Sequence, residues 1–288
     1  MAVGSTGDQD WLAAFEATGA AVRRATAALL GTEAGRAEIG VGAGGDRTVE
    51  LDRAAEEAAL AELGRFAAAG HPCSVLSEEA GVVDLGAPWP LVILDPVDGS
   101  VNAKQGLPLT AVMLSLAEGP TVGDVRVGWT LNLISGERWS AVRGAGAYRD
   151  GRRLTPLPPA GRPGRIDVLG LESRARDLCL LQALFEHTSK VRILGSMALL
   201  VAHGAAGGIE VFAVPFAARI FDMTAGLLMV DEVGGVVTDL DGRSVRDAAV
   251  GLDSRTTLLG SAHPGLHRLA LDALGADPGR PGRGVAGG

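Results

Sequence analysis

The chain has 288 residues, of which 47% are hydrophobic and 4% aromatic, and its formal net charge is −8 at pH 7. This length allows a well-buried core in one large domain or two of ordinary size. The negative charge leaves no basic footprint for nucleic acid, so we expect no nucleic-acid partner. The acidic N-terminus does not resemble a signal peptide, and no apolar run is long enough to span a membrane. We therefore expect no membrane partner. The presence of only two cysteines favours a reduced, cytoplasmic protein.

The first half of the sequence predicts two helices followed by a series of short strands. Apolar residues at helical spacing place the helices at 11–30 and 48–69, and the glycine-rich stretch 40–45 between them is interpreted as a flexible linker. Strands are predicted at 74–76, 91–94, 111–117, 125–131, 138–142 and 147–148. The glycine-containing turns between them are typical of antiparallel pairing.

A stretch rich in proline and glycine, 152–165, indicates a domain boundary. It would separate an N-terminal α+β domain (1–155) from a C-terminal α/β domain (156–278). Beyond it, strands predicted at 166–171, 191–194, 209–214, 236–239 and 256–259 alternate with helices at 175–187, 196–206, 222–232 and 264–274. Such alternation favours an α/β half. The tail 279–288, rich in glycine, proline and arginine, is expected to be disordered.

The segment Asp95-Pro96-Val97-Asp98-Gly99-Ser100 follows the apolar run 91–94 and is the most informative part of the chain. Two carboxylates three residues apart at the end of a strand repel each other unless a cation lies between them. Pro96 restricts the backbone there, and Gly99 permits a close backbone approach. The segment therefore predicts a divalent-metal site beside a small anion-binding turn. The simpler alternative is that Asp95 and Asp98 only cap the helix that follows.

Two more acidic residues stand at the ends of predicted elements. Glu78 follows the strand 74–76, and Asp222 begins the helix 222–232. Hard carboxylate ligands favour Mg²⁺, Mn²⁺ or Ca²⁺ over zinc.

Taken in order, these motifs resemble the inositol monophosphatase superfamily, whose members are Mg²⁺-dependent, lithium-sensitive phosphomonoesterases. The resemblance rests on Ser77-Glu78-Glu79, on the Asp95 segment continued by Val101-Asn102, and on Phe221-Asp222-Met223-Thr224-Ala225-Gly226 followed by Gly234-Gly235. Gly195-Ser196-Met197-Ala198 and Asp52 also match, so the resemblance covers roughly 46–260. It implies an α/β fold, the layered α/β/α/β/α sandwich of this superfamily, and a homodimer.

The resemblance also implies a role for each of these residues. Glu78, Asp95 and the Val97 carbonyl would hold a first metal ion, and Asp95, Asp98 and Asp222 a second. Two or three Mg²⁺ ions are expected, with Mn²⁺ as a substitute. The catalytic residues would be Glu78 and Ser100, which orient or deprotonate the attacking water, and Asp52, which would hydrogen-bond Ser100.

The predicted substrate side departs from the inositol-specific pattern. Those members carry a glutamate where this chain has Pro215 and a tryptophan where it has Phe221. The segment 102–108 and Arg219 are more similar to archaeal-type members that act on both fructose 1,6-bisphosphate and inositol phosphates. The implied substrate contacts are Asp98, Gly99, Ser100, Asn102, Gly195, Ser196 and Arg219. Three alternatives stay open: Asn102 as a turn residue, Gly195-Ser196 as a strand-to-helix turn with an N-cap, and Arg219 in a surface salt bridge.

The sequence thus predicts a phosphoric monoester hydrolase, a Mg²⁺-dependent phosphatase that uses a metal-activated water on a small phosphorylated metabolite. The metabolite would be a sugar, polyol or nucleotide phosphate. The alternatives are a fructose-1,6-bisphosphatase, a 3′-phosphoadenosine-type nucleotide phosphatase, and a non-catalytic regulatory or binding protein with the same fold. The presence of all four acidic ligands argues against the last.

Overall fold

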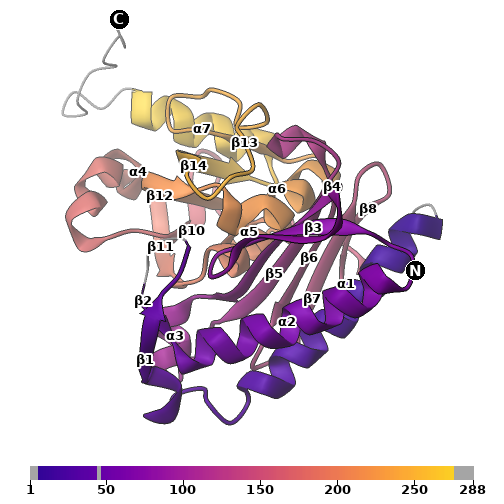
Figure 1. The fold of residues 1–288 in the computed structure, drawn as a ribbon. Coiled ribbons are helices and arrows are strands. Elements are labelled where there is room, and N and C mark those ends of the chain that lie inside the picture. The colour runs from indigo at the N-terminus through magenta and orange to yellow at the C-terminus, as the bar shows by residue number, and fades with distance from the viewer. Residues whose placement is uncertain (1–5, 44–46, 276–288) are drawn as a thin grey trace, which may run out of the picture.

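A computed structural model describes residues 6–43 and 47–275, and in these ranges helices and sheets alternate in layers (Figure 1). Helices α1 (Thr6–Thr26) and α2 (Glu50–Ala68) cover the outer face of the larger sheet. Helices α5 (Met197–Ala205) and α6 (Thr224–Glu232) lie between this sheet and a smaller one. Helices α4 (Gln182–Glu186) and α7 (Pro264–Gly275) cover the far face of the smaller sheet. The predicted α/β/α/β/α sandwich is confirmed.

In the described part of the chain, the larger sheet has the strand order β3-β4-β5-β6-β7-β8-β9. Its strands are β3 (Cys73–Ser77), β4 (Gly81–Asp98), β5 (Ala111–Ala117), β6 (Val125–Asn132), β7 (Arg138–Val142), β8 (Gly146–Arg149) and β9 (Arg152–Arg153). Side chains alternate between its two faces. On β4, Val92 and Leu94 pack toward α1 and α2, whereas Ile93 packs toward α5 and α6. Because both faces are covered, the central strand β5 is apolar except for the buried Ser115.

The smaller sheet has the order β11-β10-β12-β14-β13 within the described residues. Its strands are β10 (Ile166–Leu171), β11 (Thr188–Ile193), β12 (Val211–Arg219), β13 (Val236–Thr238) and β14 (Arg255–Ser261). Strand β10 pairs in parallel with both β11 and β12, while β14 pairs antiparallel with β12 and β13. The parallel pairs follow from the predicted alternation of strands and helices, whereas the antiparallel pairing of β14 does not.

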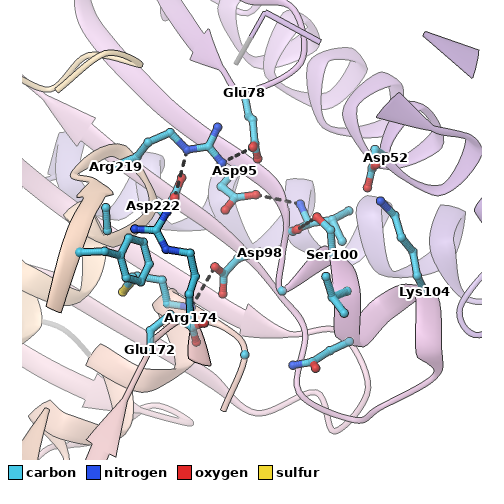
Figure 2. A pocket seen from close by; sticks show the side chains of 18 of the residues that line it. Asp52, Glu78, Asp95, Asp98, Ser100, Lys104, Glu172, Arg174, Arg219 and Asp222 are labelled. Carbon is cyan, nitrogen blue, oxygen red and sulfur yellow. Dashed lines mark hydrogen bonds and ion pairs between the residues drawn. The ribbon is translucent and has the colours of Figure 1, made fainter. Parts of the chain in front are cut away.

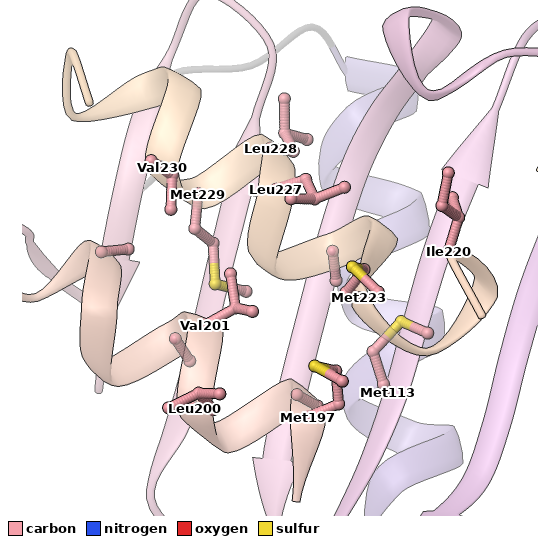
Figure 3. Close-up of a cluster of buried hydrophobic side chains, with 14 of the residues drawn as sticks. Met113, Met197, Leu200, Val201, Ile220, Met223, Leu227, Leu228, Met229 and Val230 are labelled. Carbon is pink, nitrogen blue, oxygen red and sulfur yellow. The ribbon is translucent and has the colours of Figure 1, made fainter. Parts of the chain in front are cut away.

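The middle helical layer joins the two halves of the sequence in one core. Met197, Leu200 and Val201 of α5 meet Leu227 and Met229 of α6 (Figure 3). Met113 of β5 packs into the same cluster from the larger sheet. Almost every residue of α5 is buried, as expected of a helix covered on all sides.

Several predicted elements are wrong in type or extent. The stretch 40–45 is not simply a linker, because β1 (Glu38–Val41) pairs antiparallel with β2 (Arg47–Val49). The first helix ends at Thr26, short of residue 30. The helix expected over 175–187 is a 3₁₀ helix, Ala175–Leu181, followed by the short α4.

Two further differences concern the sheets. The pairing of β3 with the later part of β4 is parallel, from Ser74 opposite Leu91 to Ser77 opposite Leu94, and not antiparallel as predicted. Strand β12 continues through Pro215 to Arg219, with an irregular register between Val214 and Ala218. Proline is tolerated in a strand at such irregularities because no ladder bond needs its missing N–H. The predicted disordered tail, 279–288, lies outside the described residues.

Candidate active site

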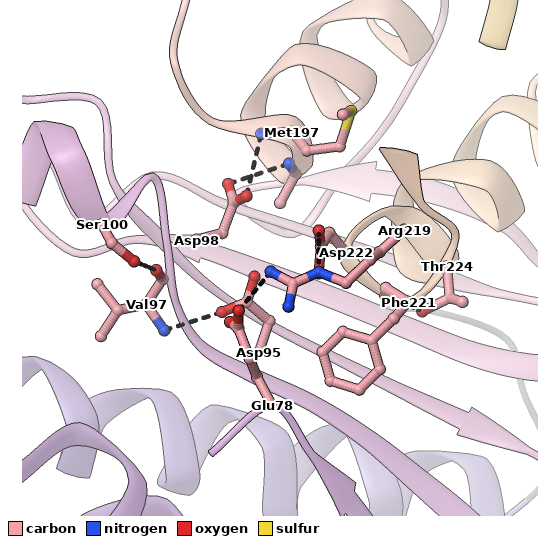
Figure 4. Close-up of polar contacts among 11 residues, drawn as sticks. Glu78, Asp95, Val97, Asp98, Ser100, Met197, Arg219, Phe221, Asp222 and Thr224 are labelled. Carbon is pink, nitrogen blue, oxygen red and sulfur yellow. Dashed lines mark hydrogen bonds and ion pairs between the residues drawn. The ribbon is translucent and has the colours of Figure 1, made fainter. Parts of the chain in front are cut away.

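Three carboxylates from distant segments converge where the two halves of the chain meet. Glu78 lies just after β3, Asp95 lies near the end of β4, and Asp222 lies in the 3₁₀ turn Phe221–Met223 between β12 and α6. One oxygen from each side chain lies within 4.8 Å of the others (Figure 4). The register of β3 on β4 explains the first pair, because Ser77 is opposite Leu94 and the next residues are Glu78 and Asp95.

A bulge in β4 gives the Asp95 segment its shape. Asp95 is opposite Met113 and Asp98 is opposite Ala111, so three steps along β4 match two steps along β5. In a regular strand, residues three apart point to opposite faces. The extra residue lets both aspartates line the same cavity. Pro96 fits the bulge because it has no N–H to contribute to the ladder.

The carboxylate cluster carries strong mutual repulsion. Burial and the charges of Glu78, Asp98 and Asp222 raise the pKa of Asp95 well above its usual range. Burial raises the pKa of Asp222 to about 7, against the opposing effect of Arg219. Arg219 donates to Glu78, and its Nε lies 3.3 Å from Asp222 Oδ2. The salt bridge proposed for Arg219 therefore exists, but inside the cavity and not on the outer surface.

Asp98 binds the N-terminus of α5 on the other half of the chain. Its Oδ1 accepts from the Met197 N–H at 3.0 Å, and its Oδ2 accepts from the Ala198 N–H at 3.0 Å and from the Ser196 hydroxyl. These bonds lower the pKa of Asp98, but burial outweighs them and raises it to about 7. Asp98 is near the carboxylate cluster without belonging to the group of three that meets within 4.8 Å.

The turn predicted to bind an anion comes directly after Asp98 in the chain. Gly99 has φ +81°, and a Cβ there would lie 2.9 Å from the carbonyl oxygens of Gly195 and Leu109, so only glycine fits. Ser100 begins the short helix α3 (Ser100–Gln105). Its hydroxyl donates to the Val97 carbonyl at 3.0 Å, and the Val97 N–H donates to Asp95 Oδ1 at 3.0 Å. The turn is thereby tied to the carboxylate cluster.

Three of the predicted substrate contacts lie where the two halves of the chain meet. Asn102 is 7% exposed, and its Nδ2 donates to the carbonyls of Leu109 and Leu194 at 2.7 Å each. Ser196 is the N-cap of α5, accepting from the Leu199 N–H at 3.2 Å. Gly195, with φ +70°, lies against Asn102. The turn and N-cap alternatives thus describe their observed structural roles.

Asp52 lines the same cavity, in the first turn of α2. Its Oδ2 accepts from the Val49 N–H at 3.1 Å. Burial raises its pKa, while the Lys104 charge acts in the opposite direction (Figure 2). The described hydrogen bonds do not join Asp52 to Ser100, because the Ser100 hydroxyl points to Val97.

The cavity around these groups has a volume of about 1050 Å³ and includes residues that the sequence analysis missed. Glu172 and Arg174 line it just beyond β10, with Phe216 and Arg255 from the neighbouring strands. Glu79 also lines the cavity; it is partly buried and accepts from Thr48. One signal could have identified Glu172 and Arg174: they follow the carboxyl end of a predicted α/β strand, where ligand sites of such sheets gather.

The residues present fit a divalent cation. Glu78, Asp95 and Asp222 offer hard oxygen donors, the type that Mg²⁺ and Mn²⁺ prefer. Oδ1 of Asp222 is buried with no hydrogen-bond partner among the described residues. A buried acceptor of this kind carries an energetic cost that a bound cation would remove.

Comparison with known proteins agrees with this geometry. Residues 10–274 match the inositol monophosphatase family. The chain belongs to the inositol monophosphatase family. A fructose-1,6-bisphosphatase/inositol-1-monophosphatase of the archaeon Thermococcus kodakarensis is 32% identical over 87% of this chain and 91% of its own. Inositol-1-monophosphatase ImpA of Mycolicibacterium smegmatis is 34% identical over 80% of this chain and 81% of its own. The predicted resemblance to archaeal-type members is confirmed.

A solved structure has the same fold. The extragenic suppressor protein suhB from Bartonella henselae superposes with a TM-score of 0.75 and 26% identity, covering 92% of this chain and 98% of its own. Membership of this family makes the chain a phosphoric monoester hydrolase. None of the helices in 6–43 and 47–275 has the length and apolar character needed to cross a lipid bilayer.

Proposed function

We propose that this member of the inositol monophosphatase family is a Mg²⁺-dependent phosphatase that hydrolyses a small phosphate monoester with a metal-activated water. The observation that carries the proposal is the meeting of Glu78, Asp95 and Asp222 within 4.8 Å, in a cavity of about 1050 Å³ large enough for a phosphorylated metabolite. Relatives described as fructose-1,6-bisphosphatases/inositol-1-monophosphatases support a sugar or polyol phosphate as substrate.

The proposed ligands are Glu78, Asp95, Asp222, the Val97 carbonyl and Asp98, which together would hold two or three Mg²⁺ ions, with Mn²⁺ as a substitute. When bound, these ions stabilise charge on the phosphoryl oxygens and lower the pKa of a coordinated water. Asp98 would fulfil this role while bonded to the N-terminus of α5, which fixes the direction of its carboxylate.

Other residues of the chain would bind the phosphate and move the proton. Glu78 and the Ser100 hydroxyl would orient the attacking water, and Glu78 would accept its proton. The backbone N–H groups of Gly99 and Ser100 would donate to the phosphate. Asp52, with Lys104 beside it, would position the start of α2 beside this turn. Arg219 would face the phosphate oxygens from the second half.

We further propose two domains, 1–155 and 156–278, with the active site between them. The absence of helix and strand from 154–165 supports this division. A cytoplasmic location is supported by two free cysteines, the buried Cys73 and the exposed Cys179. The homodimer proposed from family resemblance is tested by light scattering after size exclusion. A mass near the monomer's 29.3 kDa would contradict it.

A panel of phosphate esters tests the proposed function. Inositol 1-phosphate, fructose 1,6-bisphosphate, sugar monophosphates and 3′-phosphoadenosine 5′-phosphate are incubated with the full chain, and released phosphate is measured. We expect turnover of at least one ester with Mg²⁺ or Mn²⁺ and loss of turnover in EDTA. No turnover of any ester with either metal would favour the non-catalytic alternative. Turnover that survives EDTA would reject the metal requirement.

A further inference from the structure

The wall of the cavity just beyond β10 carries two charged side chains without a role in the proposed chemistry. Glu172 directly follows β10, and Arg174 lies two residues further on with an extended backbone. Both line the cavity that holds the carboxylate cluster (Figure 2). Glu172 accepts a hydrogen bond from the Gly195 N–H, and the next residue, Ser196, donates its hydroxyl to Asp98. This wall therefore lies beside the reacting groups.

Glu172 presents a hydrogen-bond acceptor that the protein leaves unsatisfied. Its carboxylate accepts a hydrogen bond from the Gly195 N–H. Its Oε2, by contrast, is buried with no hydrogen-bond partner among the described residues. An unsatisfied buried acceptor costs stability, and a ligand that brings a donor recovers that cost on binding. Because an ionised carboxylate only accepts hydrogen bonds, the matching ligand group is a hydroxyl or another donor.

Arg174 presents the complementary group, a guanidinium held in one position. It stacks over the Phe216 ring at 4.6 Å, and its Nε donates to Asp177 Oδ2 at 2.6 Å. Its side chain stays 53% exposed. A guanidinium fixed in this way loses little conformational freedom when its remaining N–H groups bind a ligand oxygen.

We propose that Glu172 and Arg174 recognise the alcohol portion of the substrate and determine specificity. Glu172 accepts a hydrogen bond from a substrate hydroxyl, and Arg174 donates to a neighbouring oxygen. On this assignment the two residues bind the hydroxyl-bearing part of the sugar or polyol phosphate proposed above, and they contribute little to an ester of an apolar alcohol. The inference rests on the proposed phosphatase function and adds the residues that select the leaving alcohol.

Two esters separate this role from a general effect on the site. Inositol 1-phosphate offers hydroxyls beside the scissile phosphate, whereas phenyl phosphate offers none. For Glu172→Ala we expect KM for inositol 1-phosphate to rise about tenfold, equivalent to about 1.4 kcal/mol of binding. The constants for phenyl phosphate should change less than about twofold, since binding shared by ground and transition states appears in KM alone. Arg174→Ala should show the same selective pattern.

Matched variants keep the result interpretable. Glu118→Gln, an exposed carboxylate outside this cavity, should leave the constants for both esters at wild-type values. Glu172→Met keeps a side chain of similar length without the carboxylate acceptor, and it replaces Glu172→Ala if the alanine variant melts at a lower temperature. Equal effects on the two esters, or no effect on either, would overturn the assignment while wild-type turnover still supported the proposed function. A wild-type chain that hydrolyses no phosphate ester of the panel described above would overturn both.

Discussion

Asp95 is the residue on which the proposed site depends most, because it is 2% exposed and lies among three other carboxylates. Asp95→Asn removes its charge with almost no change in volume. We expect kcat with Mg²⁺ to fall by at least about a thousandfold, since metal-assisted phosphate chemistry needs the anionic ligand. In EDTA the variant should melt no lower than the wild type, because the neutral amide ends the repulsion with its neighbours. Phosphate-release rates and thermal melts measure the two effects.

Asp84→Asn is the matched control for this substitution, because Asp84 is an exposed residue of the same strand, β4. It should retain wild-type turnover. Near-normal activity of Asp95→Asn would contradict the proposed metal site. A loss of activity accompanied by a lower melting temperature in EDTA would show a folding defect in place of a lost ligand.

The residues with charge at element ends could be predicted from sequence, whereas their hydrogen bonds could not. Glu78, Asp95 and Asp222 each stand at the end of a predicted element, and the family resemblance assigned them to one site. The bonds from Asp98 to α5 depend on packing between segments about a hundred residues apart. A local sequence pattern cannot predict contacts between segments so far apart in the chain. For the same reason, only the structure shows that Glu172 and Arg174 line the same cavity as Asp98.

At the scale of elements, the contact of α6 with β6 depends on a missing side chain. A Cβ at Gly128 would lie 2.9 Å from the backbone Cα and O of Ala225. Gly128→Ala should therefore push helix from sheet and lower the free energy of unfolding by about 1–3 kcal/mol. Gly64→Ala is the opposite case, because Gly64 is inside α2 with open space around its Cβ position. Alanine there should stabilise by about 0.5–1 kcal/mol.

Urea titrations of the two alanine variants measure both free energies against the wild type. The test is that the change in the free energy of unfolding has opposite signs in the two variants, although both replace glycine by alanine. A Gly128→Ala variant as stable as Gly64→Ala would show that α6 can shift away from β6 without cost.

The packing of α5 on β7 makes stability depend on pH through His203. Its ring meets Trp139 edge-on at 5.1 Å, and burial, with the Arg149 charge, lowers the pKa of His203 below 6.5. The unfolded chain then binds this proton more tightly than the folded chain. Stability is therefore complete above about pH 6.5 and is lost as pH falls through that value. We expect His203→Gln to weaken the loss of urea resistance between pH 7 and pH 5.5. If the variant loses as much urea resistance as the wild type, other groups cause the pH dependence. One of them would be His267, because burial also lowers the pKa of that residue.

Elements with a clear period were predictable, and those made by tertiary contacts were not. The strands 111–117 and 138–142 were predicted with their observed bounds. The hairpin β1–β2 was missed because its glycine-rich sequence does not alternate as strands do. The strands form through their antiparallel pairing, in which Glu38 is opposite Val49. The parallel pairing of β3 with β4 was missed because β4 first forms a hairpin with β3, from Ser77 opposite Gly81, and then returns beside it.

At the scale of the whole molecule, the two proposed domains share one core. Met113 and Trp139 of the first half pack in the same cluster as Met197, Phe212 and Met223 of the second. We expect one cooperative unfolding transition, because separating the halves would expose this cluster to water. Circular dichroism and tryptophan fluorescence should then give coincident urea transitions. Two separated transitions would show that the halves fold independently.

A divalent cation should stabilise the entire chain and not one half, because its proposed ligands come from both. Glu78 and Asp95 precede residue 155 and Asp222 follows it. A ligand that binds only the folded state at about a hundred times its Kd adds about 2.7 kcal/mol. For a chain of this length, that corresponds to a rise in Tm of roughly 5 °C. Thermal melts with millimolar MgCl₂, against NaCl of equal ionic strength, measure the rise. Asp95→Asn should show almost none of it, and a wild-type Tm that Mg²⁺ leaves unchanged would reject a cation site between the halves.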